Sequence, residues 1–510
     1  MRLLRLLAAM FAAVALHASA TPHFHDANDL WISPFESGWG INIFHQGDTL
    51  FASLFVYGQD GKARWYTASS LVGVDQGDRP AFYSGTLAES SGPGIGGAFD
   101  PARVTRRVVG NMSIELGTES TPQNPLRNYA NIIYDIDGVR VVKRAYPFSF
   151  GNLGLTGSYT GYLTNAASGA RDDANMNVTL NGAAFAMSMN TSASGSCTFS
   201  GTKDLNGSLF NVIGTYSCSG STASGAFVLR NVDVTRHGFT AKVSFNGMTF
   251  TDLTAQRTSS AIRGDGYATD LWLAPGESGW GLNIVEQGDT LFGTLFVYDA
   301  TGQPRWYSAS NLTYEICAPP DAASDCSGRY RGALVESSGP WFGTTFNEVS
   351  VQRRQVGTMT VAIYGNNTAH LEYTVDGVTV PLKNLSRYAF RTNSLAGSYA
   401  GHIRDMSGNG GRGMLLGDMR IDVLDSGSSI VVTMSSSQTC TMRAQRGQFG
   451  RQVIASGPYD CGGAPFGQML LSDIHVTASG FTGTVDFGTD PGVNNFYTVG
   501  RIEATRLPAR

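Results

Sequence analysis

The chain has few charged residues and no excess of basic ones. Asp, Glu, Lys and Arg make up 15% of its 510 residues, and the formal net charge at pH 7 is −4. A surface that binds nucleic acid needs clustered Lys and Arg side chains, and this sequence contains no such stripe. We therefore expect no nucleic acid partner. Long apolar runs are also lacking, so we expect no segment that spans a bilayer.

Common catalytic and cofactor motifs are lacking as well. The sequence contains no G-x-S-x-G elbow, no H-E-x-x-H pair and no phosphate-binding loop. Histidines are few, and those in one half have no counterpart in the other: His45 aligns with Glu286, and His370 aligns with Asn131. We expect neither a cofactor nor a metal site.

The first residues, 1–20, have the pattern of a secretory signal peptide. Arg2 and Arg5 precede an apolar run over residues 6–16, and Ala-Ser-Ala at 18–20 supplies the small residues that signal peptidase requires. We expect cleavage near Ala20 and a secreted protein, either extracellular or periplasmic.

Six cysteines are consistent with that oxidising location. Cys197 and Cys218 are 21 positions apart, and Cys440 and Cys461 repeat that spacing in a matching context. Each pair is expected to form a disulfide that stabilises the fold by roughly 3 kcal/mol. The remaining two, Cys317 and Cys326, bracket an insertion and form the third predicted pair. Zinc binding is the competing interpretation, but paired C-x-x-C spacing is absent.

One stretch occurs twice. Asp29–Leu71 and Asp270–Leu312 are identical at 28 of 43 positions, and both contain the strings ESGWG, QGDTLF and RWY. Six of the seven tryptophans lie in this repeat as matched pairs. The pairs are Trp31 with Trp272, Trp39 with Trp280, and Trp65 with Trp306.

The whole chain has the composition of an all-β protein. It contains 63 glycines, and aromatic and β-branched residues alternate with polar ones between Gly-Asp and Asp-Gly turn signals. We predict tandem antiparallel barrels or sandwiches in the order A-B-A′-B′, a duplication of a two-domain unit. The predicted divisions are the signal peptide (1–20), domain A (21–150), domain B (151–257), a linker (258–268), domain A′ (269–390) and domain B′ (391–510).

The repeat predicts its own strand register. If Gly47-Asp48 is a two-residue hairpin turn, Asn42 faces Ser53 on one side of the sheet and Ile41 faces Leu54 on the other. Taking Asp60-Gly61 as the next two-residue turn places the third strand. The predicted neighbours are then Trp65 beside Val56, Tyr66 beside Phe55 and Arg64 beside Tyr57. If either loop is longer and carries a bulge, the third strand flips and its tryptophan changes sides.

This register gives the repeat an aliphatic core face with a Trp-Val-Trp row and a mixed second face of aromatic, amide and basic side chains. One interpretation of the mixed face is a domain interface in which A packs on B and A′ packs on B′. The other is a platform on which planar aromatic side chains stack on a carbohydrate or a small apolar ligand. The candidate ligand-binding residues are Asn42, Phe55, Tyr57, Arg64 and Tyr66, with Asn283, Phe296, Tyr298, Arg305 and Tyr307 in the second copy.

Paired carboxylates provide a weaker catalytic hypothesis. A polysaccharide hydrolase needs two acids facing each other across the scissile bond. The acids present in both copies that best fit this role are Glu36 with Glu89, and Glu277 with Glu336. Glu36, next to Ser37-Gly38, is as well placed to hold a backbone amide as a proton, and duplication favours binding, because two linked weak sites gain avidity.

The string W-x-x-P-x-E-S-G-W-G-x-N-x-x-x-Q-G-D, followed by F-V-Y and R-W-Y, resembles a repeat of secreted bacterial proteins that carries no assigned activity. The strand count also resembles avidin and lipocalin barrels, a likeness of architecture alone. We expect a non-enzymatic binding or surface-interaction protein. An extracellular hydrolase and a purely structural or adhesive protein are the alternatives, and the sequence indicates no particular protein partner.

Overall fold

Four closed β-barrels make up the described part of the chain. The computed structural model describes residues 27–507 apart from 75–80, 120–126, 152, 165–169, 192–194, 220–222, 236–237, 249, 259–267, 318–325, 366, 406–416, 463, 478–479 and 489–497. Each barrel has eight antiparallel strands that follow one another around the wall in chain order. The prediction of tandem all-β barrels in the order A-B-A′-B′ is confirmed, and the alternative of sandwiches is wrong.

Barrel A consists of β1 (Asp29–Ile32), β2 (Gly40–Gln46), β3 (Thr49–Tyr57), β4 (Ala63–Val74), β5 (Ala81–Ser91), β6 (Thr105–Glu119), β7 (Arg127–Ile136) and β8 (Val139–Pro147). Barrel B consists of β9 (Gly157–Thr164), β10 (Arg171–Asn181), β11 (Ala184–Thr191), β12 (Gly195–Asn206), β13 (Leu209–Cys218), β14 (Ser224–Thr235), β15 (Gly238–Phe245) and β16 (Thr251–Arg257).

Barrel A′ consists of β17 (Asp270–Leu273), β18 (Gly281–Gln287), β19 (Thr290–Tyr298), β20 (Pro304–Glu315), β21 (Cys326–Ser338), β22 (Gln352–Tyr364), β23 (Thr368–Val375) and β24 (Val378–Arg387). Barrel B′ consists of β25 (Gly397–Asp405), β26 (Gly417–Asp425), β27 (Ser429–Ser435), β28 (Thr439–Phe449), β29 (Gln452–Cys461), β30 (Ala464–Thr477), β31 (Gly480–Gly488) and β32 (Thr498–Arg506). Two short 3-10 turns, η1 (Pro101–Arg103) and η2 (Glu348–Ser350), occupy equivalent loops of A and A′.

Each barrel has its own hydrophobic core. The interior of A holds the predicted aliphatic face of the repeat, with Ile41, Ile43 and Leu54 fully buried. Barrel B has its own core, in which Cys197 on β12 and Cys218 on β13 are cross-strand partners. All three predicted disulfides are present, and they join 197 to 218, 317 to 326 and 440 to 461.

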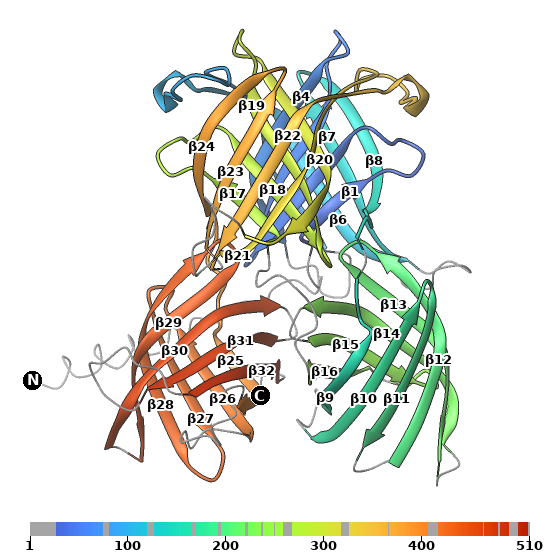
Figure 1. Cartoon of the computed structure of the whole chain (residues 1–510), viewed down its shortest axis with the longest axis vertical. Helices are drawn as coiled ribbons and strands as arrows, with labels where there is room; N and C mark the ends of the chain where they lie inside the picture. The colour runs from blue at the N-terminus through green and yellow to red at the C-terminus, as the bar shows by residue number, and fades with distance from the viewer. Residues whose placement is uncertain are drawn as a thin grey trace, which may run out of the picture.

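The four barrels are arranged as two pairs. Figure 1 shows A and A′ packed against each other at the top, with B below one side and B′ below the other. The strands β9, β15 and β16 of B approach β25, β31 and β32 of B′ in the middle of the molecule. We call the A–A′ pair the head. Barrels B and B′ are therefore held side by side by a shared head as well as by their own contact.

The predicted pairing of the first hairpin is confirmed. Cα partners between β2 and β3 include Asn42 with Ser53 and Ile41 with Leu54, as a Gly47-Asp48 turn requires. The third strand is displaced by one residue from its prediction. Trp65 pairs with Phe55, so the indole leaves the predicted core row and joins the mixed face.

The reason for the displacement is a longer loop after β3. The amide of Gly58 donates to the carbonyl of Lys62 at 2.9 Å, which closes a five-residue connection. Asp60 stabilises this loop by accepting hydrogen bonds from the Lys62 amide at 3.1 Å and from Arg64 at 2.8 Å. A one-residue change in register moves every side chain of the strand to the opposite face. Tyr66 consequently lies in the interior of A.

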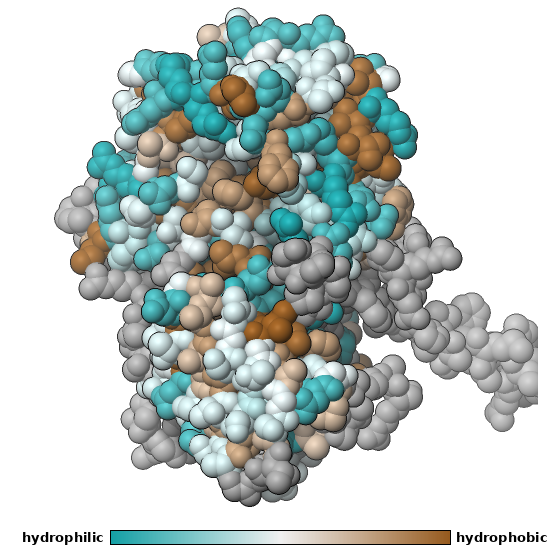
Figure 2. All heavy atoms as spheres, turned by 90° about the vertical axis from the view of Figure 1, so that its right-hand side faces the viewer, coloured by the Kyte–Doolittle hydropathy of each residue, from teal (hydrophilic) through white to brown (hydrophobic). Residues whose placement is uncertain are grey.

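The outer surface shows no single large apolar face on the side formed by A and B. In Figure 2 hydrophobic residues occur there as separate patches among polar ones. Among the described residues, no helix has the length and apolar character needed to cross a membrane. The predicted signal peptide and nearly all of the predicted linker, 258–268, lie outside the described residues.

Candidate functional site

The ten candidate ligand-binding residues of the repeat lie in the head. Nine of them fall in the buried class of side chains, and Arg64 is held at the rim of A by its ion pair with Asp60. Tyr66 and Tyr307 lie inside their barrels, whereas Arg305 is paired with Asp299 at the rim of A′. The candidates that contact the other A-type barrel include Phe55, Tyr57, Asn283, Phe296, Tyr298 and Arg305, whose guanidinium donates to the Ala63 carbonyl at 3.2 Å.

The mixed face is thus covered by the other A-type barrel. The interface interpretation named B as the partner of A, and that assignment is wrong for this face, because its partner is A′. The indole nitrogen of Trp65 donates to the carbonyl of Val297 at 3.1 Å, and Trp306 donates to Val56 at 3.1 Å. The contact therefore has pseudo-twofold symmetry, in which each repeat supplies the same donor and the same acceptor. No observation tests whether these residues bind a ligand.

The string ESSGP, which occurs at 89–93 in A and at 336–340 in A′, closes the edges of this contact. The Gly92 amide donates to the Gly302 carbonyl at 3.2 Å, and Gly339 donates to Gly61 at 3.0 Å. Neither glycine can be replaced by a residue that has a side chain. A Cβ at Gly92 would lie 2.6 Å from the ring of Tyr298, and a Cβ at Gly339 would clash equally with the other barrel.

The residues that follow these glycines reach into the partner barrel. Phe342 and Phe346 of A′ pack against the core of A, and Ile95 and Phe99 of A pack against the core of A′. Each A-type barrel is therefore completed by a loop of the other.

The QGD string of A binds the connection between A′ and B′. The side-chain amide of Gln46 donates to the Tyr388 carbonyl at 3.0 Å, and its oxygen accepts from the amides of Phe390 at 3.0 Å and Arg391 at 3.1 Å. Asp48 pairs with the guanidinium of Arg391 at 2.6 Å. We refer to this arrangement as the QGD clamp.

The QGD string of A′ makes the reciprocal clamp on the connection between A and B. Gln287 donates to the Phe148 carbonyl at 2.8 Å and accepts from the amides of Phe150 at 2.8 Å and Gly151 at 3.0 Å. Both inter-barrel connections are thus fixed by the head.

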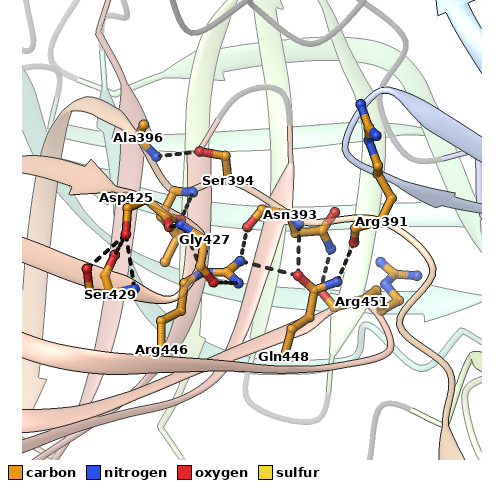
Figure 3. Close-up of polar contacts among 12 residues, drawn as sticks. Arg391, Asn393, Ser394, Ala396, Asp425, Gly427, Ser429, Arg446, Gln448 and Arg451 are labelled. Atoms are coloured by element: carbon orange, nitrogen blue, oxygen red, sulfur yellow. Dashed lines mark hydrogen bonds and ion pairs between the residues drawn. The ribbon is translucent and has the colours of Figure 1, made fainter. Parts of the chain in front are cut away.

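Barrel B′ binds its connection from the other side. Asn393 donates from its backbone to the side chain of Gln448 at 2.9 Å, and Gln448 donates to the Arg391 carbonyl at 2.6 Å (Figure 3). Arg446 and Asp425 form an ion pair of 3.1 Å whose side chains are 2% and 0% exposed. This network joins the A′–B′ connection to the wall of B′.

The carboxylates of the catalytic hypothesis are engaged in ion pairs. Glu36 contacts the amine of Lys143 at 2.8 Å and accepts from the indole of Trp39 at 2.9 Å. Glu277 makes the same ion pair with Lys383 at 2.8 Å.

The second acids of the two predicted pairs are occupied in the same way. Glu89 is paired with Arg107 at 2.8 Å, and Glu336 with Arg354 at 2.7 Å. These contacts lie within single barrels and give all four acids a structural role.

A different site lies between barrels B and B′. A cleft of about 100 Å³ separates the β14–β16 wall of B from the β30–β32 wall of B′. We call it the B–B′ cleft. Its polar and charged lining residues are Asn231, Asp233, Thr240, Lys242, Asp252 and Thr254 from B, and His475, Thr477, Thr482, Arg501, Glu503 and Thr505 from B′.

Charged groups lie on both walls of the cleft. Lys242 and Asp252 on B form an ion pair of 2.6 Å. On B′, burial raises the pKa of Glu503, and the positive charge of Arg501 opposes that rise. Glu503 also accepts a hydrogen bond from the hydroxyl of Tyr162 on B at 3.2 Å, so it belongs both to the cleft and to the contact beside it.

That contact joins the two B-type barrels directly. Arg171 of B pairs with Asp418 of B′, and the same carboxylate lies 2.7 Å from Nδ1 of His402. The rings of Tyr162 and His402, which occupy matching positions in the two modules, are 5.6 Å apart. One side of the cleft is therefore closed by polar contacts between the barrels.

Asn231 is an unusual member of the lining. It has a left-handed backbone, with φ of 51°, at a β-bulge of β14, and Asp473 repeats this with φ of 54° at the bulge of β30. The side-chain oxygen of Asn231 is buried and has no hydrogen-bond partner among the described residues. Bulges, strained backbone and unpaired polar atoms are over-represented at functional sites.

The sequence interpretation missed this cleft. The pairing of β15 with β16 matches that of β31 with β32, which makes Thr254 equivalent to Glu503 and Asp252 equivalent to Arg501. The interior positions of the two modules keep their apolar character, but these outward positions differ in charge.

The comparisons give no further assignment. The described residues contain no group of three or more His, Cys, Asp or Glu side chains placed to hold a metal ion. No protein-family model matches the chain, and no curated protein matches it significantly.

Proposed function

We propose that this protein is a non-enzymatic binding protein that holds a polar ligand in the B–B′ cleft. The observation that carries the proposal is the cleft itself: two walls from different barrels bring charged and hydroxyl side chains around one space. Concave sites in which a few polar groups converge are the usual places for ligands. The head serves as the scaffold that keeps the two walls in place.

The contacts that hold barrels B and B′ on the head support this proposal, because they position the two walls of the cleft before a ligand binds. The clamps made by Gln46 and Gln287 fix the connections that lead into B′ and B. Hairpins of the B-type barrels also dock on the head, where Asp29 accepts from the amide of Ser208 at 2.7 Å and Asp270 accepts from that of Arg451 at 3.1 Å. A site that is rigid before binding loses less entropy when the ligand arrives.

We further propose that the protein acts outside the cytoplasm. The N-terminal pattern of residues 1–20 supports secretion, and so do the three disulfides, which persist in oxidising compartments.

A structural or adhesive role is the second candidate. It is favoured by the positions of the repeated motifs in the structure. All of them contribute to the A–A′ contact or to the barrels that form it: ESGWG, QGD, RWY and ESSGP. This candidate predicts that no small ligand binds in the B–B′ cleft.

The experiment is a thermal-shift screen of the mature protein against a library of polar metabolites and short oligomers. Thr482 lines the cleft, and Thr482→Trp fills part of it. Thr198, which is exposed on β12 and is not part of the cleft lining, provides the control Thr198→Trp. We expect at least one compound to raise the Tm of the wild type and of the control but not of Thr482→Trp.

A compound that stabilises all three proteins equally would place its site elsewhere and contradict the proposal. The absence of any stabilising compound would favour the structural role. Turnover of a bound oligomer, lost in Glu36→Gln with Glu277→Gln, would instead establish the hydrolase alternative.

A further inference from the structure

The wall of the B–B′ cleft that belongs to B has an excess of negative charge. Its lining contains two carboxylates, those of Asp233 and Asp252, and one amine, that of Lys242. The amine pairs with Asp252 at 2.6 Å, and the half-buried Asp233 accounts for the excess. Because opposite charges attract, a ligand group that contacts this wall binds better if it is cationic.

The B′ wall presents a positive charge instead. Arg501 is half-buried there, whereas the neighbouring Glu503 is 5% exposed and accepts a hydrogen bond from Tyr162 in the B–B′ contact. Burial raises the pKa of Glu503, which favours its neutral form. The guanidinium of Arg451 contacts Nε2 of His475, a further lining residue, and adds positive charge behind this wall. An anionic ligand group is therefore favoured on B′.

Hydroxyl groups accompany the ionisable ones at matching positions of the two walls. Asp233 is the cross-strand partner of Thr240 on B, and His475 is that of Thr482 on B′. Cross-strand partners project from the same face of a sheet, and all four residues line the cleft. An ammonium group donates hydrogen bonds and a carboxylate accepts them, so a hydroxyl can bond to either.

The size of the cleft limits the ligand further. The space between the walls is about 100 Å³. A cavity of about 150 Å³ accommodates a molecule the size of benzene. The cleft therefore fits a compact molecule in which the cationic and anionic groups are separated by very few bonds, such as the backbone of a free amino acid.

From the opposite charges of the walls and the size of the space, we propose that the ligand of the B–B′ cleft is a small zwitterion of the amino acid type. Its ammonium group lies against Asp233 and its carboxylate against Arg501. This inference rests on the proposed function, because it names the ligand class of the same site. A ligand with one charge alone would be attracted by one wall and repelled by the other.

The test is isothermal titration of the mature protein with glycine, alanine and serine, and with two analogues of alanine. Alaninamide keeps the ammonium group but lacks the carboxylate, and propionate keeps the carboxylate but lacks the ammonium group. We expect at least one of the amino acids to bind. We also expect alanine to bind at least about tenfold more tightly than either analogue, because each analogue loses a hydrogen bond between charged groups.

Two variants assign the two ends of the ligand. Asp233→Asn should weaken the binding of alanine about tenfold and leave that of propionate unchanged, because propionate has no ammonium group. Arg501→Gln should also weaken alanine about tenfold and leave alaninamide unchanged, because alaninamide has no carboxylate. If one variant fails to fold, the other variant and the analogues still decide the result.

The matched controls remove the same charges outside the cleft. Asp173→Asn changes a residue of B whose side chain is 80% exposed, and Arg443→Gln changes one of B′ whose side chain is 64% exposed. Neither residue belongs to the cleft lining. Both controls should bind alanine as the wild type does, and far-UV circular dichroism checks the fold of all four variants.

The contrary outcomes separate the two proposals. Equal affinity for alanine and both analogues, with binding lost in Thr482→Trp, would overturn the zwitterion inference but keep the cleft as a binding site. Binding of alanine that Thr482→Trp leaves unchanged would overturn both proposals. Binding of no amino acid would overturn the zwitterion inference, and the thermal-shift screen with other polar compounds would then decide the proposed function.

Discussion

Replacing Trp306 by Phe removes one hydrogen bond of the A–A′ contact, the one that the indole nitrogen donates. The indole nitrogen donates to the carbonyl of Val56 in the other barrel at 3.1 Å, and Trp306 is 2% exposed. Phe keeps most of the ring but leaves that buried acceptor unpaired, which costs about 1–3 kcal/mol. The lost apolar area adds about 1 kcal/mol. We therefore expect a loss of about 2–4 kcal/mol in the free energy of unfolding of the head.

The equivalent tryptophan of barrel A makes the same contact and provides a second variant. Trp65 donates to Val297 at the same distance of 3.1 Å, so Trp65→Phe should cost nearly as much as Trp306→Phe. The assay is urea unfolding followed by far-UV circular dichroism, with hydrogen exchange measured by mass spectrometry. Exchange should accelerate in both barrels for either variant, because each indole contacts the opposite barrel.

Trp39→Phe is the matched control. The indole of Trp39 donates to Glu36 of its own barrel at 2.9 Å, so its loss should affect exchange in A more than in A′. The reasoning would be refuted if Trp65→Phe disturbed A alone. That result would mean that Trp65 lies in the core of A, as the two-residue turn Asp60-Gly61 predicts.

Three further predictions concern other parts of the molecule. Gln46→Leu removes three hydrogen bonds of one QGD clamp and should cost about 2–3 kcal/mol, measured as a lower urea midpoint; an unchanged midpoint would exclude a stabilising role for the clamp. Burial and the nearby charge of Asp473 raise the pKa of Asp486 from 3.8 to about 6. Folding therefore favours the protonated carboxyl group of Asp486. Its contribution to the free energy of unfolding is fully present below about pH 3.8 and is lost as the pH rises through about 6. Asp486→Asn should therefore stabilise the protein by about 1 kcal/mol at pH 8, after allowance for solvent screening, and not at pH 3.5; equal gains at both pH values would contradict this cause. Phe35 is 88% exposed with φ of 63°, so Phe35→Gly should raise stability by up to about 1 kcal/mol, and a clear loss on thermal unfolding would show that the ring packs in solution.

The local features of this fold could be predicted from the sequence. Alternation of apolar and polar residues marks the strands, and the Gly47-Asp48 turn fixes the pairing of Ile41 with Leu54. Matching spacing in the two B-type modules identified the pairs Cys197–Cys218 and Cys440–Cys461. Each of these depends on residues that are close in the chain or repeated within it.

Features that depend on distant contacts were not accessible in the same way. The third strand was placed wrongly because Asp60 stabilises a longer loop than its Asp-Gly signal indicates. The partner of the mixed face was assigned wrongly because no pattern in the chain states that Trp65 contacts Val297, 232 positions away. The B–B′ cleft was missed because it lies between two outer faces that are each ordinary when considered alone.

The most direct test of the account is a distance measurement between B and B′. All six native cysteines are paired, so cysteines introduced at the exposed hairpin positions Ala183 of B and Ser428 of B′ can carry spin labels for double electron–electron resonance. If the head fixes the walls of the cleft, the wild type gives one narrow distance distribution, and it broadens when Phe55→Arg disrupts the A–A′ contact. A broad distribution in the wild type would show that the B-type barrels move independently, and would contradict a preformed cleft.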